Sequence, residues 1–193
     1  MNEDTRERIL EAGTELIHLH GFQGTGLKAI LDAANVPKGS FYHYFKSKED
    51  FGIAVIEYYE QVIARARFPL GQDPSLTAIQ CFEKLFELSR KFNAETNYSR
   101  GCLIANLSQE MSALSPPIRE RLQESHRKIV KTFADIVRRG QEKGEISTAF
   151  TAEEAAVFIL TCRNGALTSM KATGSEEPLL ISEKFLLQYL LPA

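Results

Sequence analysis

Tryptophan is absent from this sequence, and cysteine and histidine, two residue types common in catalytic and metal sites, are few. Three cysteines, an odd number at unrelated spacings, exclude a disulfide framework and a zinc site. Four histidines leave no credible Ser/His/Asp set, and the chain has neither a glycine-rich phosphate loop nor paired metal ligands. We therefore expect no catalytic residues, no metal and no cofactor.

Long apolar runs are also missing. No stretch approaches the roughly 18 consecutive apolar residues that a membrane-spanning helix needs, so we expect no membrane partner. The first six residues lack the basic start and apolar core of a secretion signal, which favours a cytoplasmic protein. The composition is ordinary for a globular chain, and 193 residues allow a small domain attached to a larger one.

A strongly basic composition, the usual mark of a nucleic-acid binder, is lacking as well, because the formal net charge is −2. In residues 1–50, six Lys and Arg residues stand against eight acidic ones. Between residues 27 and 48, however, there are four lysines and one aspartate, which give a local charge of +3. A small positive region on a mildly acidic protein favours specific DNA contacts of modest size over general coating of nucleic acid.

What the chain does contain is a helical pattern along its whole length. Apolar residues recur every three or four positions, and no β-strand alternation of useful length follows residue 74. We predict an all-α protein of about nine helices, at residues 5–20, 26–34, 38–44, 48–67, 75–97, 102–113, 116–143, 152–172 and 176–191. The segment 68–74 is expected to break the pattern after a connector helix. We place an N-terminal domain at residues 1–50 and a larger C-terminal domain at 51–193.

Capping residues support several of these boundaries. Ser47 with Asp50, and Thr151 with Glu154, have the spacing of a capping box, the first of them a variant form. Gly13 lies on the inward face of the first helix and has no side chain to fill space. It therefore predicts a close helix crossing.

The segment 36–48 has the chemistry of a short helix that contacts a scaffold on one side and nucleic acid on the other. Pro37 suits the first position of a helix, because its missing N–H would have had no partner there. Residues 38–44 make about two turns, which is enough for a recognition helix in a major groove. Phe41 and Phe45 lie four residues apart and share the face expected to pack on the core.

The other side chains of this segment are donors suited to phosphates and base edges. Gly39 removes a side chain where the backbone can approach DNA, and Lys48 lies at a helix N-terminus, where a phosphate can bind. Thr25, the expected N-cap of the second helix, and Lys28 complete the set. Three consecutive aromatic residues cannot share one helical face, so the competing interpretation as core fits only the two phenylalanines. The predicted DNA contacts are Thr25, Lys28, Lys38, Gly39, Ser40, Tyr42, His43, Tyr44 and Lys48.

The run VPKGSFYHYFKSKEDF closely resembles the helix-turn-helix signature of TetR-type transcriptional repressors in spacing and residue type. The resemblance implies an N-terminal three-helix DNA-binding domain and a larger C-terminal domain for ligand binding and dimerisation. It further implies a homodimer that binds a double-stranded, pseudo-palindromic operator. A small-molecule or reactive inducer would release the protein from DNA.

The last two long helices look too apolar to be covered by one chain alone. A surface of small residues permits a second helix pair to approach closely; it consists of Ala155, Ala156, Ile159, Cys162, Gly165, Ala166 and Ser169. A two-fold dimer through these helices would form a four-helix bundle, as TetR-type proteins do. The alternative is an ordinary intramolecular core.

Cys81 and Cys162 lie among apolar or small residues and are best interpreted as small buried hydrophobes. Cys102 differs, because it follows Arg100 and Gly101 and stands in the predicted first turn of a helix. Unsatisfied N–H groups and a nearby guanidinium would favour its thiolate there. The residues alone leave a buried, inert cysteine as an open alternative.

Residues 99–103, with Leu107 and Ser108, resemble the segment that carries the sensor cysteine in the NemR-like branch of TetR repressors. The likeness returns from Gly165 to Lys171, while the rest of the C-terminal domain diverges from that branch. The resemblance implies a response to reactive chlorine species, quinones and other electrophiles. Cys102 would be the sensor and Lys171 its neighbour.

The leading hypothesis is therefore a DNA-binding repressor released from its operator by oxidant or electrophile modification of Cys102. Within the same class, the alternative is a repressor that binds a small apolar ligand non-covalently, in a cavity lined by Phe82, Phe86, Phe133 and Phe158. An enzyme has no residues to support it. A protein-interaction module would be indicated by failure to bind any DNA.

Overall fold

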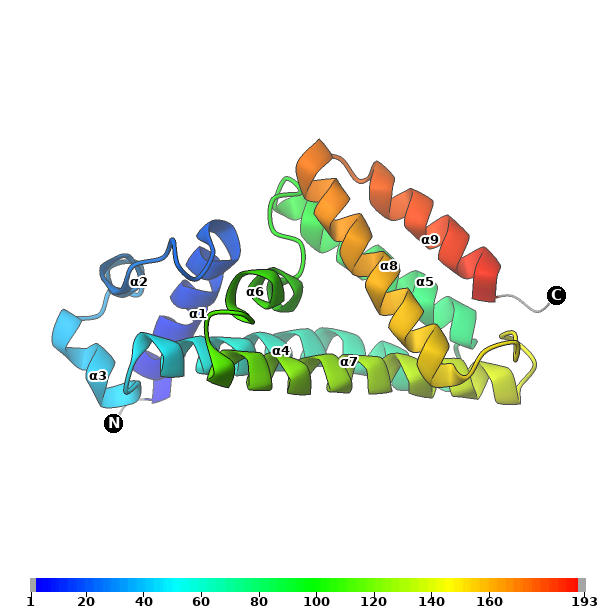
Figure 1. Cartoon of the computed structure of the whole chain (residues 1–193), viewed down its shortest axis with the longest axis horizontal. Coiled ribbons are helices and arrows are strands. Elements are labelled where there is room, and N and C mark those ends of the chain that lie inside the picture. The colour runs from blue at the N-terminus through cyan, green and yellow to red at the C-terminus, as the bar shows by residue number, and fades with distance from the viewer. Residues whose placement is uncertain (1–2, 191–193) are drawn as a thin grey trace. The chain divides into compact units, whose positions relative to one another are not determined.

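The computed structural model describes residues 3–190, apart from the side chains of Glu3, Arg67 and Phe68, and within them the chain is helical. Nine α-helices and one short 3-10 helix, η1, follow one another, and this part of the chain contains no strand, so the all-α prediction is confirmed (Figure 1). None of the described helices is long and apolar enough to cross a membrane. The elements are α1 Glu3–His20, α2 Leu27–Ala33, η1 Lys38–Ser40, α3 Phe41–Tyr44, α4 Lys48–Gln72, α5 Ala78–Glu95, α6 Leu103–Met111, α7 Pro116–Glu142, α8 Ala152–Thr173 and α9 Glu177–Leu190.

Local capping decides where several helices begin. Thr151 and Glu154 form the predicted capping box at the start of α8, with each side chain bonded to the other residue's backbone N–H. Thr77 and Gln80 form a second box, so α5 begins at Ala78 rather than at residue 75. Gly174 ends α8 with a φ of +65°, a left-handed conformation that glycine adopts without a Cβ clash.

The predicted break in the fourth helix is wrong. Helix α4 continues through Pro69 to Gln72, although proline removes one backbone donor from the helix. Side chains satisfy carbonyl groups of its last turn, because Arg139 donates to the Gly71 oxygen at 3.0 Å and the Cys81 thiol donates to the Leu70 oxygen at 3.2 Å. These contacts stabilise a helix end that local sequence would have terminated earlier.

The chain divides into two compact units. One contains residues up to 63 together with 103–125, and the other contains 64–102 together with the residues from 126 onward. Helices α4 and α7 each contribute their first part to the first unit and their second part to the second unit. This division differs from the predicted boundary at residue 50, because α6 and the start of α7 belong with the N-terminal helices.

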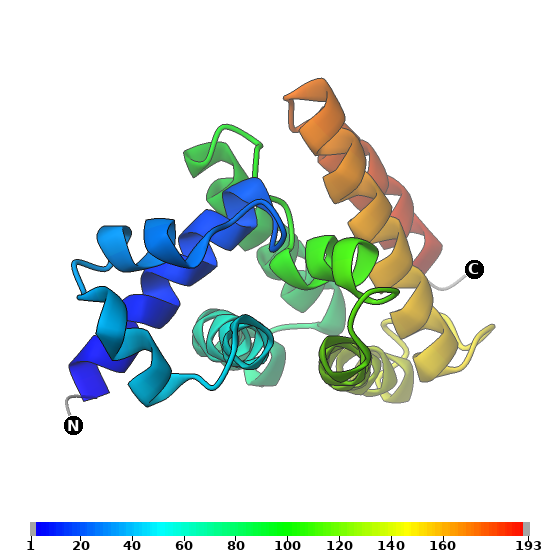
Figure 2. The same cartoon turned by 60° about the vertical axis from the view of Figure 1, so that its left-hand side comes forward.

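The first unit is built around an aromatic cluster. Phe41, Phe45 and Phe51 are buried, with ring centroids 4.9 to 5.5 Å apart. Helix α2 packs against α1 (Figure 2). Gly13 of α1 faces the Phe51 ring, and a Cβ added there would lie 2.2 Å from Phe51 Cζ. The close helix crossing predicted from Gly13 is therefore present.

Gly13→Ala is expected to lower the free energy of unfolding by about 1–3 kcal/mol, because the new methyl group overlaps the fully buried Phe51 ring. Chemical denaturation with urea measures the change. Gly39→Ala is the matched control, since no atom lies within 4 Å of its added Cβ. Equal stability of the two variants would contradict the close packing at Gly13.

The second unit has its own core, formed by α5, the second part of α7, α8 and α9. Phe82 and Phe133 meet edge to face at 5.7 Å, and α8 packs along α9 (Figure 1). Two arginines tie the helices together: Arg163 donates to the Ser89 hydroxyl at 3.0 Å in the interior, and Arg90 makes a partly buried pair with Glu183. Burial raises the pKa of Glu183, and the Arg90 charge opposes that shift.

Candidate nucleic-acid interface and sensor region

The recognition segment, residues 38–45, contains a 3-10 turn and one short α-helix instead of a single regular α-helix. Pro37 is the N-cap of η1, with φ −59° and ψ 143°, so the prediction that it occupies the first helical position is wrong. A 3-10 turn, Lys38–Ser40, leads directly into α3. With a ψ of 143°, Pro37 itself is extended, so the chain enters this turn in an extended conformation.

The turn before this segment is held by a residue that the sequence reasoning missed. Arg8 of α1 donates to the carbonyl groups of Ala34 at 2.5 Å and Asn35 at 3.0 Å. Asn35 has a φ of +52°, a conformation that asparagine tolerates better than most residues. A single arginine on a helix carries no local signal of such a long-range contact, so only the folded chain reveals it.

The aromatic residues of the segment separate as predicted. Phe41 and Phe45 are only 1% and 2% exposed, whereas Tyr42 is 66% exposed. His43 is exposed and Tyr44 is partly exposed. Among the other predicted contacts, Lys28, Lys38 and Gly39 are exposed and Ser40 is partly exposed. These seven residues form an accessible surface on α2, η1 and α3, once the two phenylalanines are set aside.

Thr25 does not have the predicted role. The N-cap of α2 is Gly26, with no side-chain capping bond, so the prediction that Thr25 caps this helix is wrong. Thr25 is 3% exposed, and its hydroxyl donates to the Gly21 carbonyl at 2.6 Å. Because that hydroxyl is buried and already bonded, Thr25 supports the turn between α1 and α2 and is not positioned to bind DNA through its side chain.

Lys48 lies at the start of α4, as expected, but its ammonium group is partly used within the protein. It donates to the Phe22 carbonyl at 2.7 Å and lies 4.7 Å from the centre of the Phe22 ring. Burial lowers the pKa of Lys48, and the nearby Glu110 carboxylate partly offsets that effect. Ser47 caps α4 by accepting from the Asp50 N–H at 3.0 Å, while Asp50 itself accepts from Lys46 N–H.

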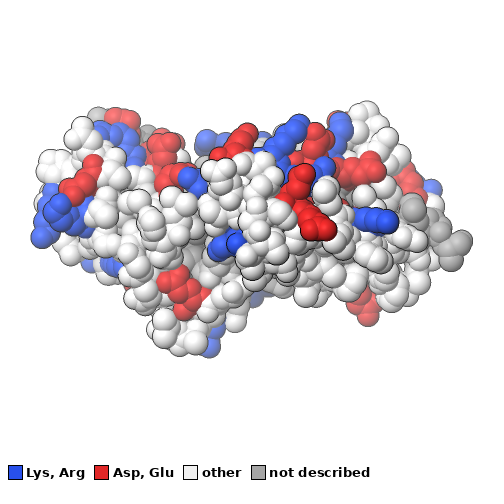
Figure 3. Space-filling view, turned by 90° about the horizontal axis from the view of Figure 1, so that it is seen from above, with Lys and Arg blue, Asp and Glu red and all other residues white. Residues whose placement is uncertain are grey.

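The charge distribution fits a small contact surface. On the face seen in Figure 3, Lys and Arg side chains alternate with Asp and Glu, and no broad field of one sign is present. Lys28 of α2 is paired with Asp32 at 2.6 Å. Lys38 is the lysine of η1, and it is exposed. Strong non-specific binding needs many phosphate contacts. Specific recognition by a few side chains is therefore the mode that this surface supports.

Tyr42→Ala and Lys38→Ala are expected to weaken operator binding in different ways. Loss of one hydrogen bond from Tyr42 should cost about 0.5–1.5 kcal/mol, or up to roughly tenfold in Kd, with an unchanged dependence on salt. Loss of a phosphate contact from Lys38 should reduce the slope of log K against log salt by about one. Fluorescence anisotropy over a salt series separates the two. Unchanged affinity in both variants would remove them from the interface.

Cys102 lies immediately before α6, which begins at Leu103, so it does not stand in the first turn of the helix as predicted. It is 7% exposed. The loop that leads to it is held by the buried Asn93, whose side-chain oxygen accepts from Gly101 N–H at 3.0 Å and whose carbonyl accepts from Tyr98 N–H at 2.7 Å. Cys102 is therefore buried between a hydrogen-bonded loop and the first residue of α6 in the chain.

Lys171 is exposed in the last turn of α8. The structure thus places the two predicted sensor residues in different environments, one protected and the other accessible. Burial raises the pKa of Cys162, which disfavours its thiolate and makes it a weak competitor as a nucleophile.

The four phenylalanines considered for a ligand cavity do not surround one space. Phe82, Phe86 and Phe133 are buried in the core of the second unit, whereas Phe158 is 43% exposed and packs on Tyr189 with a centroid distance of 4.9 Å. A cavity beside Phe86 has a volume of only about 10 Å³, roughly enough for one water molecule.

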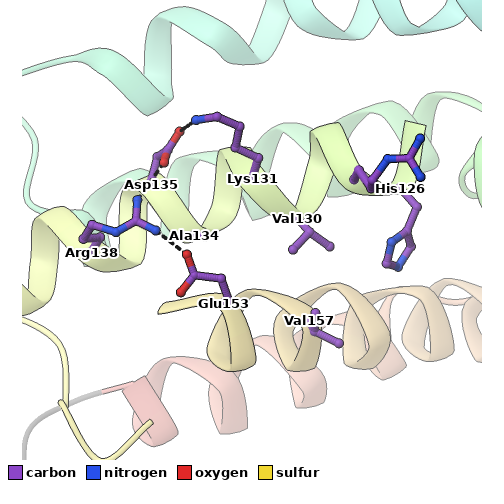
Figure 4. A pocket seen from close by; sticks show the side chains of 9 residues that line it. His126, Val130, Lys131, Ala134, Asp135, Arg138, Glu153 and Val157 are labelled. Atoms are coloured by element: carbon purple, nitrogen blue, oxygen red, sulfur yellow. Dashed lines mark hydrogen bonds and ion pairs between the residues drawn. The ribbon is translucent and has the colours of Figure 1, made fainter. Parts of the chain in front are cut away.

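A larger groove of about 370 Å³ lies between α7 and α8. Val130 and Val157 face each other across it (Figure 4). The charged groups at its rim are paired, Lys131 with Asp135 at 2.7 Å and Arg138 with Glu153 (Figure 4). Four of its charged side chains are therefore already paired within the protein.

The small-residue surface predicted for dimerisation points largely inward. Of its seven residues, Ala155, Ala156, Ile159 and Ala166 are buried within the second unit, so the prediction of a free surface is wrong for these four. Cys162 is partly exposed, and Gly165 and Ser169 are exposed. The helix register instead turns another set of apolar side chains outward on α8 and α9: Val157, Phe158, Leu180, Ile181 and Phe185. Phe185 is 65% exposed, an unusual state for so large an apolar side chain.

Comparison with known proteins agrees with this architecture. Residues 9–55 match a family described as "Bacterial regulatory proteins, tetR family", and residues 78–183 match "Tetracyclin repressor-like, C-terminal domain". The transcriptional repressor DhaR of Mycobacterium sp. (strain GP1) is 33% identical over 90% of this chain and 86% of its own length.

Two further relatives link sequence to solved structures. The repressor NemR of Escherichia coli K12 is 30% identical over 91% of this chain and 88% of its own. The structure of E. coli NemR in its reduced form has a TM-score of 0.90 at 29% identity and covers 97% of both chains. The regulatory protein TetR from Rhodobacter sphaeroides has a TM-score of 0.91 at 31% identity, over 96% of this chain and 98% of its own.

The exposed donors on a short helical segment, the all-helical fold and these full-length similarities lead to one conclusion. The chain belongs to the TetR family of bacterial transcriptional regulators and is a DNA-binding repressor rather than an enzyme.

Proposed function

We propose that this repressor binds a pseudo-palindromic operator as a homodimer in the cytoplasm and is released when an oxidant or electrophile modifies Cys102. Regulators of this family bind operator DNA and function as dimers. The observation that carries the DNA-binding part is the separation of aromatic faces at η1 and α3. Two buried phenylalanines anchor the segment, and Lys38, Tyr42 and His43 project into solvent.

The exposed apolar stripe on α8 and α9 supports the dimer. It is formed by Val157, Phe158, Leu180, Ile181 and Phe185, and these side chains are 43% to 65% exposed. A second copy packed on the stripe would bury them in a four-helix bundle and would present two recognition segments to one operator.

The position of Cys102 supports the proposed release by an oxidant or electrophile. It precedes α6 directly, so a change of volume or charge at its sulfur acts at the first residue of that helix. NemR, a relative at 30% identity, has been solved in what is described as its reduced form. The non-covalent alternative has less support, because its four phenylalanines do not meet around one cavity.

Selection of bound DNA from a random pool tests the proposal. The reduced protein should enrich one pseudo-palindromic sequence, and the same selection after hypochlorite treatment should enrich none. Two half-sites are expected with centres about 34–36 Å apart, or near a multiple of that distance. Enrichment of a single half-site would contradict the dimer, and enrichment unaffected by hypochlorite would contradict the oxidant signal.

A further inference from the structure

The turn between α1 and α2, residues 21–24, is held by side chains from α6. The two carboxylate oxygens of Glu110 accept hydrogen bonds from the backbone N–H groups of Phe22 at 2.9 Å and Gln23 at 2.7 Å. Gln23 in turn donates from its side-chain amide toward the Met111 sulfur at 3.8 Å. Gly21 has a φ of +76°, and a Cβ there would lie 3.0 Å from a Glu110 oxygen. The backbone of the turn and the carboxylate are thus fitted closely together.

Helix α4 holds the same turn through the backbone carbonyl of Phe22. Lys48 donates to the Phe22 carbonyl at 2.7 Å, so both backbone groups of this residue are bound by side chains. The Phe22 ring is 5% exposed and rests on Gly52, where an added Cβ would lie 2.6 Å from the ring. One residue of the turn is therefore fixed by α6 and α4 together.

These two helices follow the predicted sensor and the recognition segment in the chain. Helix α6 begins at Leu103, directly after Cys102, and three residues separate the end of α3 from the start of α4. A carboxylate that accepts two N–H groups makes charge-assisted bonds, which are stronger than neutral ones. Glutamine cannot replace it fully, because its amide group offers only one acceptor oxygen and its NH₂ would face the second N–H.

From these contacts we propose that Glu110 is a positioning residue. It fixes the helix-turn-helix to α6 and thereby sets the separation of the two recognition segments in the dimer. The inference rests on the proposed dimer, since a separation exists only between two copies. Without the Glu110 bonds, α6 holds this turn through the longer Gln23–Met111 contact, and the helix-turn-helix can adopt a wider range of orientations relative to α6.

The direct test varies the operator spacing. Wild type, Glu110→Gln and Glu110→Ala are assayed against a series of operators in which the two half-sites are moved apart or together by one or two base pairs. Wild type should prefer its best spacing by about tenfold or more, a ratio within the usual range of coupling between two binding sites. Both variants should reduce that preference at least about threefold. Glu120→Gln, an equal charge change at an exposed residue of α7, should leave it unchanged.

A second measurement does not depend on DNA. Amide hydrogen exchange at Phe22 and Gln23 should become faster in both Glu110 variants and remain unchanged in Glu120→Gln. Equal exchange in all proteins, or a loss of affinity that is uniform over all spacings, would overturn the positioning role. Failure of the proposed dimer would be recognised separately, because wild type would then show no preference for any operator spacing. The exchange measurement would still test the contact of Glu110 with the turn.

Discussion

Phe185→Asp is expected to separate the dimer and to abolish tight operator binding. Phe185 is 65% exposed on α9, one helical turn after Ile181 and one before Tyr189, whose ring packs on Phe158 of α8. An aspartate there would have to lose its hydration when two apolar stripes meet, and an unpaired buried charge is strongly unfavourable. The monomer should still fold, because the replaced ring contributes little to the interior of its own subunit.

The expected effect on DNA binding is large. A dimer engages two half-sites at once, and the second contact is effectively intramolecular, so its loss lowers the apparent affinity by about 10²–10⁴-fold. Analytical ultracentrifugation gives the oligomeric state, and anisotropy with the selected operator gives the affinity. Both quantities should change together in Phe185→Asp.

Leu114→Asp is the matched control for this experiment. Leu114 is 62% exposed, nearly as much as Phe185, but it lies between α6 and α7 in the first unit, whereas the stripe belongs to the second unit. Its substitution should leave the dimer intact. A Phe185→Asp protein that remains dimeric, or a monomer that still binds the full operator tightly, would remove the stripe on α8 and α9 from the interface.

Cys102→Ser is expected to make the repressor insensitive to hypochlorite. In the wild type, hypochlorite is expected to oxidise the sulfur of Cys102 to a sulfenic acid and to be reduced to chloride. The sulfenic acid can then condense with an amine, with loss of water, to form a sulfur–nitrogen bond. The added volume at a residue that is 7% exposed cannot be accommodated without movement of the start of α6.

The change in operator affinity follows from the size of such a coupling. A coupling free energy of about 1–3 kcal/mol lowers affinity about 5–150-fold, so a fluorescently labelled operator should be released at stoichiometric oxidant. Because Cys102 is buried, small hypochlorite should act faster than the bulkier N-ethylmaleimide. Release of the operator from Cys102→Ser at the wild-type oxidant concentration would place the sensor elsewhere.

Two control variants sharpen this test. Cys162→Ser should respond as the wild type does, because burial raises the pKa of Cys162 and keeps it a thiol. Lys171→Ala should blunt the response to hypochlorite more than the response to alkylation, since alkylation requires no second partner. An equal loss of both responses in Lys171→Ala would indicate that this lysine acts before the chemical step.

Local signals in the sequence were sufficient to predict that most of the helices exist. The box formed by Thr151 and Glu154 predicted the start of α8, because capping involves residues only three positions apart. The spacing of Phe41 and Phe45 predicted which face of the recognition segment is buried, and Tyr42 and His43 follow on the exposed side. Helical periodicity determines such faces before any tertiary contact forms.

Only the tertiary structure decided how polar groups and apolar faces are shared between distant segments. The Thr25 hydroxyl and the Lys48 ammonium are both used at the turn between α1 and α2, and Glu110 reaches that turn from almost 90 residues away, with a sequence separation of 87 to Gln23. Ala155, Ala156 and Ile159 of α8 turn inward into the core of the second unit, which leaves Phe158 of α8 and Phe185 of α9 exposed. Periodicity gives the apolar face of a helix, but which neighbour covers that face depends on the packing of the whole chain.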